Sequence, residues 1–390
     1  MGQGEESLWG VCILAESVDA AAHSVSVSGA DPDGQQRQSA RRKSSAVLFH
    51  SGDVAPVTGG KMKRRTCFLT REQSMILRGA GVILVMVTHF INWYADLFNC
   101  EPLRYALMRS GIYGVDLFFL ASGYGLVKSA SGKKIRGIFL WKRFKNTYLP
   151  YLLIVGCIEL TSGGIHGAKD WYQFFTGYDY WFIRNILVFY LAFFLVFRSM
   201  KTPGSRITAL AACTIAYTAW LIAEKRADFW YVSNVAFWLG AAIAQYEKKL
   251  LKIANFLYPA WIAALALGVG WVVKSGMDGR LIPPMGWEKI RDGIAASAIW
   301  TLFAAQAACL LRGRLLCFLI FLGEISLEMY LLHLFLFYRV LNGFPELGIV
   351  AVGALSIGLT AVLSWLIHWL FSLLFSAAEA LGKKSGKKGR

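Results

Sequence analysis

Long apolar runs alternate with short polar and basic segments from Met75 to Ala377. A helix needs about 20 apolar residues to cross the ~30 Å hydrocarbon core of a bilayer. The short alternating segments typical of a transmembrane β-barrel do not occur in the sequence. We therefore predict an all-α, polytopic membrane protein with about ten spans. They are residues 75–96, 110–128, 146–164, 180–198, 206–223, 228–246, 254–274, 292–311, 317–340 and 347–375.

The two ends of the chain differ from this apolar region. Residues 1–61 are rich in Ser, Ala, Gly, Asp and Gln, a composition that cannot bury enough apolar surface to fold alone. We expect residues 1–61 to be a disordered extension, residues 62–377 to form the membrane domain and residues 378–390 to form a basic tail. Met62 opens the sequence Met-Lys-Arg-Arg directly before the first span, and we interpret it as the translation start.

Composition and charge narrow the class of protein further. Of the 390 residues, 56% are hydrophobic, and the net charge is +17. Most of the basic residues flank the ends of apolar runs, where they orient membrane helices, so we expect no nucleic-acid partner. They recur in every second connecting segment, and this pattern places both termini in the cytoplasm. The seven cysteines are scattered without metal-ligand spacing, so neither a metal site nor a disulfide framework is predicted.

The first predicted span carries an arginine and a histidine on one stripe. Arg78 and His89 are eleven residues apart, which is about three helical turns and a rise of about 16 Å. This spacing places Arg78 at a water interface and His89 near the middle of the bilayer. An ionisable group at that depth is costly unless it lines a polar cavity, so His89 is a candidate functional residue.

The second predicted span carries an aspartate at a similar depth. Asp116 lies about eleven residues from the cytoplasmic end of this span and needs a partner at that depth. We expect His89 on the neighbouring helix to be that partner. Gly123 and Gly125 follow it and allow another helix to approach closely.

The ninth predicted span carries three ionisable groups. Glu324 and Glu328 are four residues apart, so we expect them to share one face of a continuous helix. Counted from Arg314, they lie at roughly 14 and 20 Å of depth, with His333 further along. Three such groups in one span predict that the helix lines a polar cavity. His368, alone in the last span, is interpreted as structural.

Two further segments carry basic residues beside aromatic ones. The segment before the third span contains Lys142, Arg143 and Lys145, which serve as a topology signal, a contact for anionic lipids or a phosphate site. Arg184 lies near the outer end of the fourth span, where an aromatic belt with a snorkelling arginine is the expected arrangement.

Five segments in this order resemble the acyltransferase type 3 family of membrane-bound O-acyltransferases over about residues 70–375. They are Arg78-x10-His89, Gly114-Val-Asp-Leu-Phe-Phe-Leu-Ala-Ser-Gly123, Arg143-Phe-x4-Leu-Pro-Tyr151, Trp181-Phe-Ile183 and Gly323-Glu-Ile-Ser-Leu-Glu-Met-Tyr-Leu-Leu-His333. The family's functional arginine and histidine fall on Arg78 and His89. The family's second arginine, three residues after the first in the basic motif, is replaced here by Asn146.

The resemblance implies transfer of an acyl group, commonly acetyl, from cytoplasmic acyl-CoA to a hydroxyl of an envelope carbohydrate or related acceptor. It also implies the bacterial inner membrane. Acyl-CoA is then the donor substrate, and no bound cofactor is expected. The candidate catalytic residues are His89, Asp116, Glu324, Glu328 and His333. The candidate residues for binding the donor are Arg78, Lys142, Arg143 and Lys145.

Two other functions compete with this interpretation. A transporter or flippase of lipid or polysaccharide intermediates also has many spans and intramembrane Glu and His residues. Against it, the sequence has no repeated pair of Gly- or Pro-broken helices in matching halves. A membrane scaffold without turnover is the third alternative, and no sequence feature favours it. Dependence on acyl-CoA separates the enzyme from both.

Overall fold

The computed structural model describes residues 67–93, 101–132, 135–256, 258–277, 287–309, 311 and 313–388. The described residues all belong to one compact unit, Arg65–Arg390. Their regular structure is helical and contains no strand, which confirms the predicted all-α class. The predicted extension over residues 1–61 and the proposed start at Met62 lie outside the described residues.

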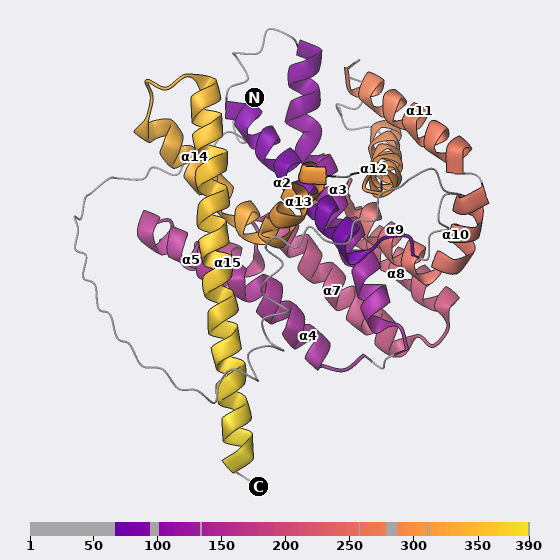
Figure 1. The fold of residues 1–390 in the computed structure, drawn as a ribbon, viewed down its shortest axis with the longest axis horizontal. Coiled ribbons are helices and arrows are strands. Elements are labelled where there is room, and N and C mark those ends of the chain that lie inside the picture. Colours follow the sequence, from indigo (N-terminus) through magenta and orange to yellow (C-terminus); the bar gives the residue numbers. More distant parts are fainter. Residues whose placement is uncertain are drawn as a thin grey trace. The chain divides into compact units, whose positions relative to one another are not determined.

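The helices follow one another with short connections (Figure 1). In chain order they are α2 (Arg71–Trp93), α3 (Glu101–Ala130), α4 (Ile138–Arg143), the π-helix η3 (Phe144–Tyr148), α5 (Leu149–Ser162), α6 (Ala168–Thr176), α7 (Trp181–Ser199), α8 (Pro203–Ala223), the 3-10 helix η4 (Asp228–Trp230), α9 (Asn234–Gln245), α10 (Glu247–Phe256), α11 (Tyr258–Met277), α12 (Trp287–Ala307), α13 (Gly313–Glu324), α14 (Ser326–Gly343) and α15 (Ile349–Lys388).

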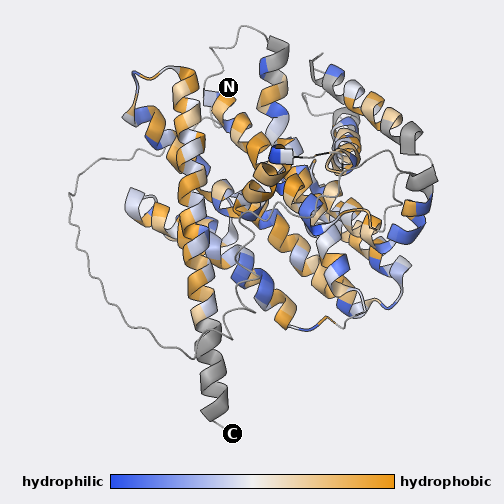
Figure 2. Cartoon of the chain, viewed as in Figure 1, coloured by the Kyte–Doolittle hydropathy of each residue, from blue (hydrophilic) through white to orange (hydrophobic). Residues whose placement is uncertain are grey.

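Several of these helices are long and apolar enough to cross a membrane. Five pass on length and composition alone, namely α2, α7, α8 and the segments Ala106–Ala130 of α3 and Ile349–Ala377 of α15. The pair α13 and α14 passes as a sixth if these bent helices count as one span. Figure 2 shows α7 and the upper part of α15 as mostly hydrophobic, whereas hydrophilic residues gather on α10. The chain is therefore an integral membrane protein.

All ten predicted spans correspond to helices, although only five or six of the described helices qualify as membrane spans. Each of the ten predicted ranges overlaps an α-helix. The ranges that match α5, α9, α11 and α12 are not among the qualifying spans of the described residues. Ten spans and a cytoplasmic location of both termini therefore remain predictions.

Glycines bring the backbones of α2 and α13 into direct contact. A Cβ atom added to Gly79 would lie 2.1 Å from the carbonyl oxygen of Leu319. One added to Gly323 would lie 2.1 Å from the carbonyl oxygen of Met75. Protein Cβ atoms essentially never approach another heavy atom this closely. Small residues at a crossing allow close helix packing in membranes, and this crossing needs glycine on both helices.

A second reciprocal pair joins α2 to α3. A Cβ on Gly81 would lie 2.7 Å from the carbonyl oxygen of Gly114, and one on Gly114 would lie 2.4 Å from that of Gly81. Glycine contacts therefore hold α2 against both α13 and α3 within three residues, Gly79 to Gly81.

A third pair joins α3 to α9. A Cβ on Gly123 would lie 2.0 Å from the carbonyl oxygen of Phe237, and one on Gly240 would lie 2.3 Å from that of Leu120. The predicted close approach at Gly123 is therefore confirmed. The same prediction for Gly125 is wrong, because no heavy atom lies within 4 Å of a Cβ built there.

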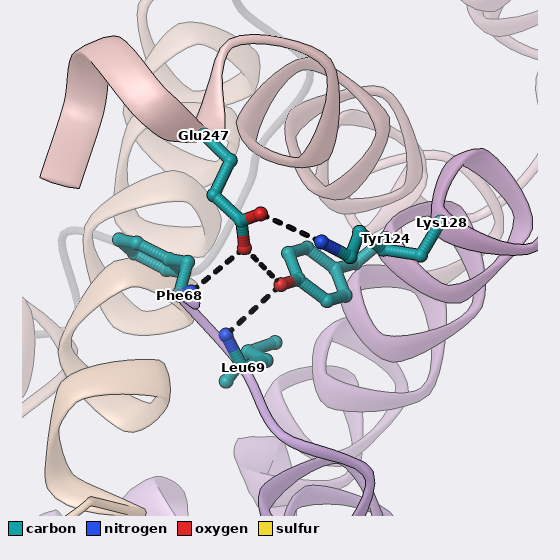
Figure 3. A network of polar contacts seen from close by, with 5 residues as sticks. All are labelled: Phe68, Leu69, Tyr124, Lys128 and Glu247. Carbon is teal, nitrogen blue, oxygen red and sulfur yellow. Dashed lines mark hydrogen bonds and ion pairs between the residues drawn. The ribbon is translucent and has the colours of Figure 1, made fainter. Parts of the chain in front are cut away.

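A polar network fixes the entry to α2 (Figure 3). Glu247 Oε1 accepts hydrogen bonds from the amide of Phe68, at 2.8 Å, and from the hydroxyl of Tyr124. Its Oε2 accepts one from Lys128 Nζ at 2.7 Å, and the amide of Leu69 donates to the Tyr124 oxygen at 3.1 Å. Burial acts to raise the pKa of Glu247, but the bonds from Lys128, Tyr124 and Phe68 outweigh it and hold the pKa below its ordinary value.

Candidate active site

Arg78 and His89 lie on one helix, as the sequence predicts. The helix α2 begins at Arg71, four residues before the predicted span. Arg78 therefore lies about 10 Å along the helix axis and His89 about 27 Å along it, close to the last residue, Trp93. The depth of each residue in the bilayer remains a prediction.

Arg78 lies within electrostatic reach of Arg143 and of Tyr190 on α7. The guanidinium carbon of Arg143 lies 5.5 Å from the centroid of the Tyr190 ring and 5.4 Å from that of Phe139. Arg78 is close enough to both Arg143 and Tyr190 to interact with them electrostatically. Among the residues that the structure describes, no ion pair joins either arginine to a carboxylate. Two neighbouring guanidinium groups without a carboxylate are suited to an anion such as a phosphate.

The basic segment Lys142–Lys145 runs into a π-helical turn beside this site. The turn η3 starts directly after Arg143, and such wide turns are frequent at functional sites. Lys142 is exposed. Lys145 turns towards α15, where its Nζ lies 4.7 Å from the centroid of the Phe375 ring. Of the three predicted basic residues, only Arg143 is therefore found beside Arg78.

His89 of α2 is in contact with His333 of α14. The centroids of the two imidazole rings are 5.0 Å apart, and the ring planes are tilted by 50°. His333 is 1% exposed, and its Nδ1 lies 2.8 Å from the carbonyl oxygen of Tyr330. Two candidates from opposite ends of the sequence are thus brought together by the fold.

The expectation that Glu324 and Glu328 share a helix face is wrong. The helix breaks between them at Ile325, where α13 and α14 are bent by 78°. Glu324 is the last residue of α13 and is exposed, whereas Glu328 lies in the first turn of α14 and is 5% exposed. The hydroxyl of Ser326 donates to the carbonyl oxygen of Gly323 at 2.9 Å and supports the break.

A partner for Glu328 comes from α15 and was missed at the sequence level. His368 Nδ1 lies 2.9 Å from Glu328 Oε1, while Glu328 Oε2 is buried without a hydrogen-bond partner. Glu324 is also close enough to His368 to interact with it electrostatically. His368 is therefore part of an acid–base pair and not an isolated structural residue. The only sequence signal was a single histidine in an apolar span.

The expected pairing of Asp116 with His89 is wrong. Asp116 is fully buried, and its Oδ1 accepts a hydrogen bond of 2.6 Å from the hydroxyl of Ser297 on α12. Gly114 faces α2, and Asp116 follows it by two residues, which is about 200° around the helix. Asp116 therefore points away from α2.

Arg184, in the first turn of α7, is inserted among aromatic side chains. The guanidinium carbon of Arg184 lies 5.7 Å from the ring centroids of Tyr178 and Trp220 and 5.9 Å from that of Trp230. Such stacking stabilises the cation through the ring faces. Arg184 thus packs within the protein, in contrast to the snorkelling arginine that the sequence predicted.

Two groups of basic side chains are separated along α2. The pair of arginines, which is suited to an anion, lies about 16 Å along the helix from the pair of histidines, and imidazole is the commonest general base in proteins. Over the described ranges, no group of three or more His, Cys, Asp or Glu side chains could hold a metal ion.

Comparison with known proteins assigns the chain to a family. The family model described as an acyltransferase domain, Acyl_transf_3, matches residues 75–370 and so includes both the arginine pair and the histidine pair. No curated protein and no solved structure matches the chain. Because the match covers most of the chain and the helices are those of a membrane protein, the chain belongs to the acyltransferase type 3 family and is a membrane acyltransferase.

Proposed function

We propose that the protein transfers an acetyl group from cytoplasmic acetyl-CoA to a hydroxyl of an envelope carbohydrate or related acceptor. The family match supports acyl transfer, and the donor, the acyl chain and the acceptor are our extension of it. In this proposal the protein resides in the cytoplasmic membrane of a bacterium.

The proposal of acetyl-CoA as donor rests on one observation, the pair of arginines near Tyr190. Arg78 and Arg143 concentrate positive charge within the helical bundle, with no carboxylate among the described residues paired to either. Coenzyme A carries several phosphates, and guanidinium groups bind phosphate through paired, charge-assisted hydrogen bonds. His89 lies further along the same helix as Arg78, in the direction in which the thioester arm of a donor held at the arginines would extend.

The proposed chemistry is direct transfer with His89 as general base. His89 takes the proton of the acceptor hydroxyl as the oxygen forms a bond to the acyl carbon, and the carbon–sulfur bond of the thioester breaks. The proton then passes to the departing thiolate, so that free CoA leaves as a thiol and His89 returns to its neutral form. Assistance by a positioned base contributes typically about 10²–10⁴ in rate.

The test is acetyl transfer by the full-length protein in membranes supplied with labelled acetyl-CoA. We expect label in alkali-labile esters of the envelope fraction, and loss of that label in His89→Ala at unchanged protein level. His166→Ala is the matched control, because His166 is exposed in the α5–α6 connection, and it should transfer like the wild type. Normal turnover by His89→Ala would exclude the assignment of the base. Absence of transfer across donors of increasing chain length would favour the transporter alternative.

A further inference from the structure

The hydrogen bond from His333 to its own helix defines which nitrogen of that ring carries the proton. A backbone carbonyl can only accept, so Nδ1 of His333 must donate to the Tyr330 oxygen 2.8 Å away. In the neutral ring this leaves Nε2 without a hydrogen and with a free lone pair. The hydrogen bond to the backbone thus keeps Nε2 of His333 as a hydrogen-bond acceptor.

This acceptor nitrogen has no partner in the protein. His333 is 1% exposed, and its Nε2 is buried without a hydrogen bond. Leaving a buried polar atom unpaired costs roughly 1–3 kcal/mol, so such an atom in a native protein calls for an explanation. Three described rings pack against that of His333, at centroid distances of 5.0 Å for His89, 5.8 Å for Tyr330 and 6.0 Å for Phe337. Of these three rings, only that of His89 carries nitrogen.

His89 in turn lacks a group that orients it. No hydrogen bond joins either of its ring nitrogens to another described residue. A general base is ordinarily held by a third group that accepts the proton of its second nitrogen. Neither Asp116 nor Glu328 is bonded to His89, since Asp116 is bonded to Ser297 and Glu328 to His368. The second oxygen of each carboxylate is buried without a hydrogen bond.

We propose that His333 is the positioning residue for His89. In the complex with substrates, one ring N–H of His89 donates to Nε2 of His333, and the other ring nitrogen of His89 is thereby presented to the acceptor hydroxyl. His333 keeps its proton on Nδ1 throughout, and the hydroxyl proton travels only to His89 and then to sulfur. This role rests on the proposed acyl transfer and adds a neutral imidazole where other enzymes use a carboxylate.

Two substitutions of His333 distinguish a role in positioning His89 from a role in packing alone. In His333→Gln the amide oxygen occupies the position of Nε2 and still accepts a hydrogen bond. In His333→Asn the amide replaces Nδ1, so the bond to Tyr330 is kept and the acceptor towards His89 is lost. We expect kcat to fall about 10–100-fold in His333→Asn, as is typical when a residue behind a functional group is removed, and to stay within about tenfold of the wild type in His333→Gln. The KM for acetyl-CoA should not change in either.

The outcomes distinguish this inference from the proposed function. If the wild type transfers no acyl group, the proposed function fails. If the wild type is active but the Gln and Asn variants lose the same activity, or if the loss is in KM, His333 does not position His89. A second measurement is independent of variant folding, since ¹⁵N NMR of histidine-labelled protein reports the tautomer. A neutral His333 with its proton on Nδ1 supports the proposal, and one with its proton on Nε2 overturns it.

Discussion

Replacing Gly79 by alanine tests whether the backbone contact between α2 and α13 holds the protein together. The added methyl carbon would lie 2.1 Å from the carbonyl oxygen of Leu319, while ordinary van der Waals contact begins at 3.4 Å. The helices must therefore separate by about 1.3 Å at this point. A side chain in the way could change its rotamer, but a carbonyl oxygen in a helix moves only with the helix.

The expected loss of stability follows from two opposing terms. Overpacking of a well-packed interior costs about 1–3 kcal/mol, and the backbone partner places Gly79→Ala at the upper end. Replacing glycine by alanine in a helix returns up to about 1 kcal/mol through intrinsic helix propensity. We therefore expect a net loss of about 2 kcal/mol. Because Arg78 is the preceding residue, the shift should also raise the KM for acetyl-CoA.

Thermal unfolding of the detergent-purified protein, followed by size-exclusion chromatography of the surviving fraction, measures this loss. Gly125→Ala is the matched control, since it lies in a helix interior with no heavy atom within 4 Å of the new methyl group. It should unfold at the wild-type temperature or slightly above. If Gly79→Ala unfolds at the same temperature as Gly125→Ala, the close contact does not limit stability and the reasoning fails.

Three further predictions concern charged groups. Arg143→Lys keeps the charge but loses the planar guanidinium, so the KM for acetyl-CoA should rise about tenfold with little change in kcat. An unchanged KM in steady-state kinetics would contradict a phosphate contact. Glu247 has a pKa below its ordinary value of 4.5, so it stabilises the fold above that pH and less as pH falls through its lowered pKa. Thermal unfolding at decreasing pH should show this loss of stability in the wild type and a smaller loss in Glu247→Gln. Equal losses in the two proteins would exclude the contribution of Glu247. His368→Phe leaves the carboxylate of Glu328 without its partner, so stability should fall by about 1–3 kcal/mol. Adding Glu328→Gln should recover part of this loss in thermal unfolding, and purely additive effects would argue against the pair.

The positions of the helices could be predicted from the sequence because hydropathy is a local property. Each predicted span overlaps an α-helix, and the ninth covers two bent helices, α13 and α14. The spacing of Arg78 and His89 in one helix needs no tertiary information. The meeting of Arg78 with Arg143 was suggested only by the resemblance to a family, since composition and spacing do not show which helices are neighbours.

The contacts between helices could not be predicted in the same way. Gly323 and Ser326 flank the break before α14, but such residues also occur in unbroken helices, so the bend could not be predicted from them. Asp116 was assigned to His89 because depth was compared without regard to the face of the helix. The pair of Glu328 and His368 joins residues 40 positions apart, and two isolated polar residues in apolar spans do not reveal such a pairing.

The contact between α2 and α13 also has a consequence for the order in which the protein assembles. Gly79 and the Leu319 carbonyl that it meets are separated by 240 positions in the sequence. During synthesis, α2 enters the membrane long before α13 exists, so one of its closest packing surfaces waits for the last part of the chain. Non-local contacts of this kind delay the completion of a fold. A chain terminated before α13 would therefore leave Gly79 without its packing partner. Arg78, the preceding residue, would then reach its native position only after α13 has been made.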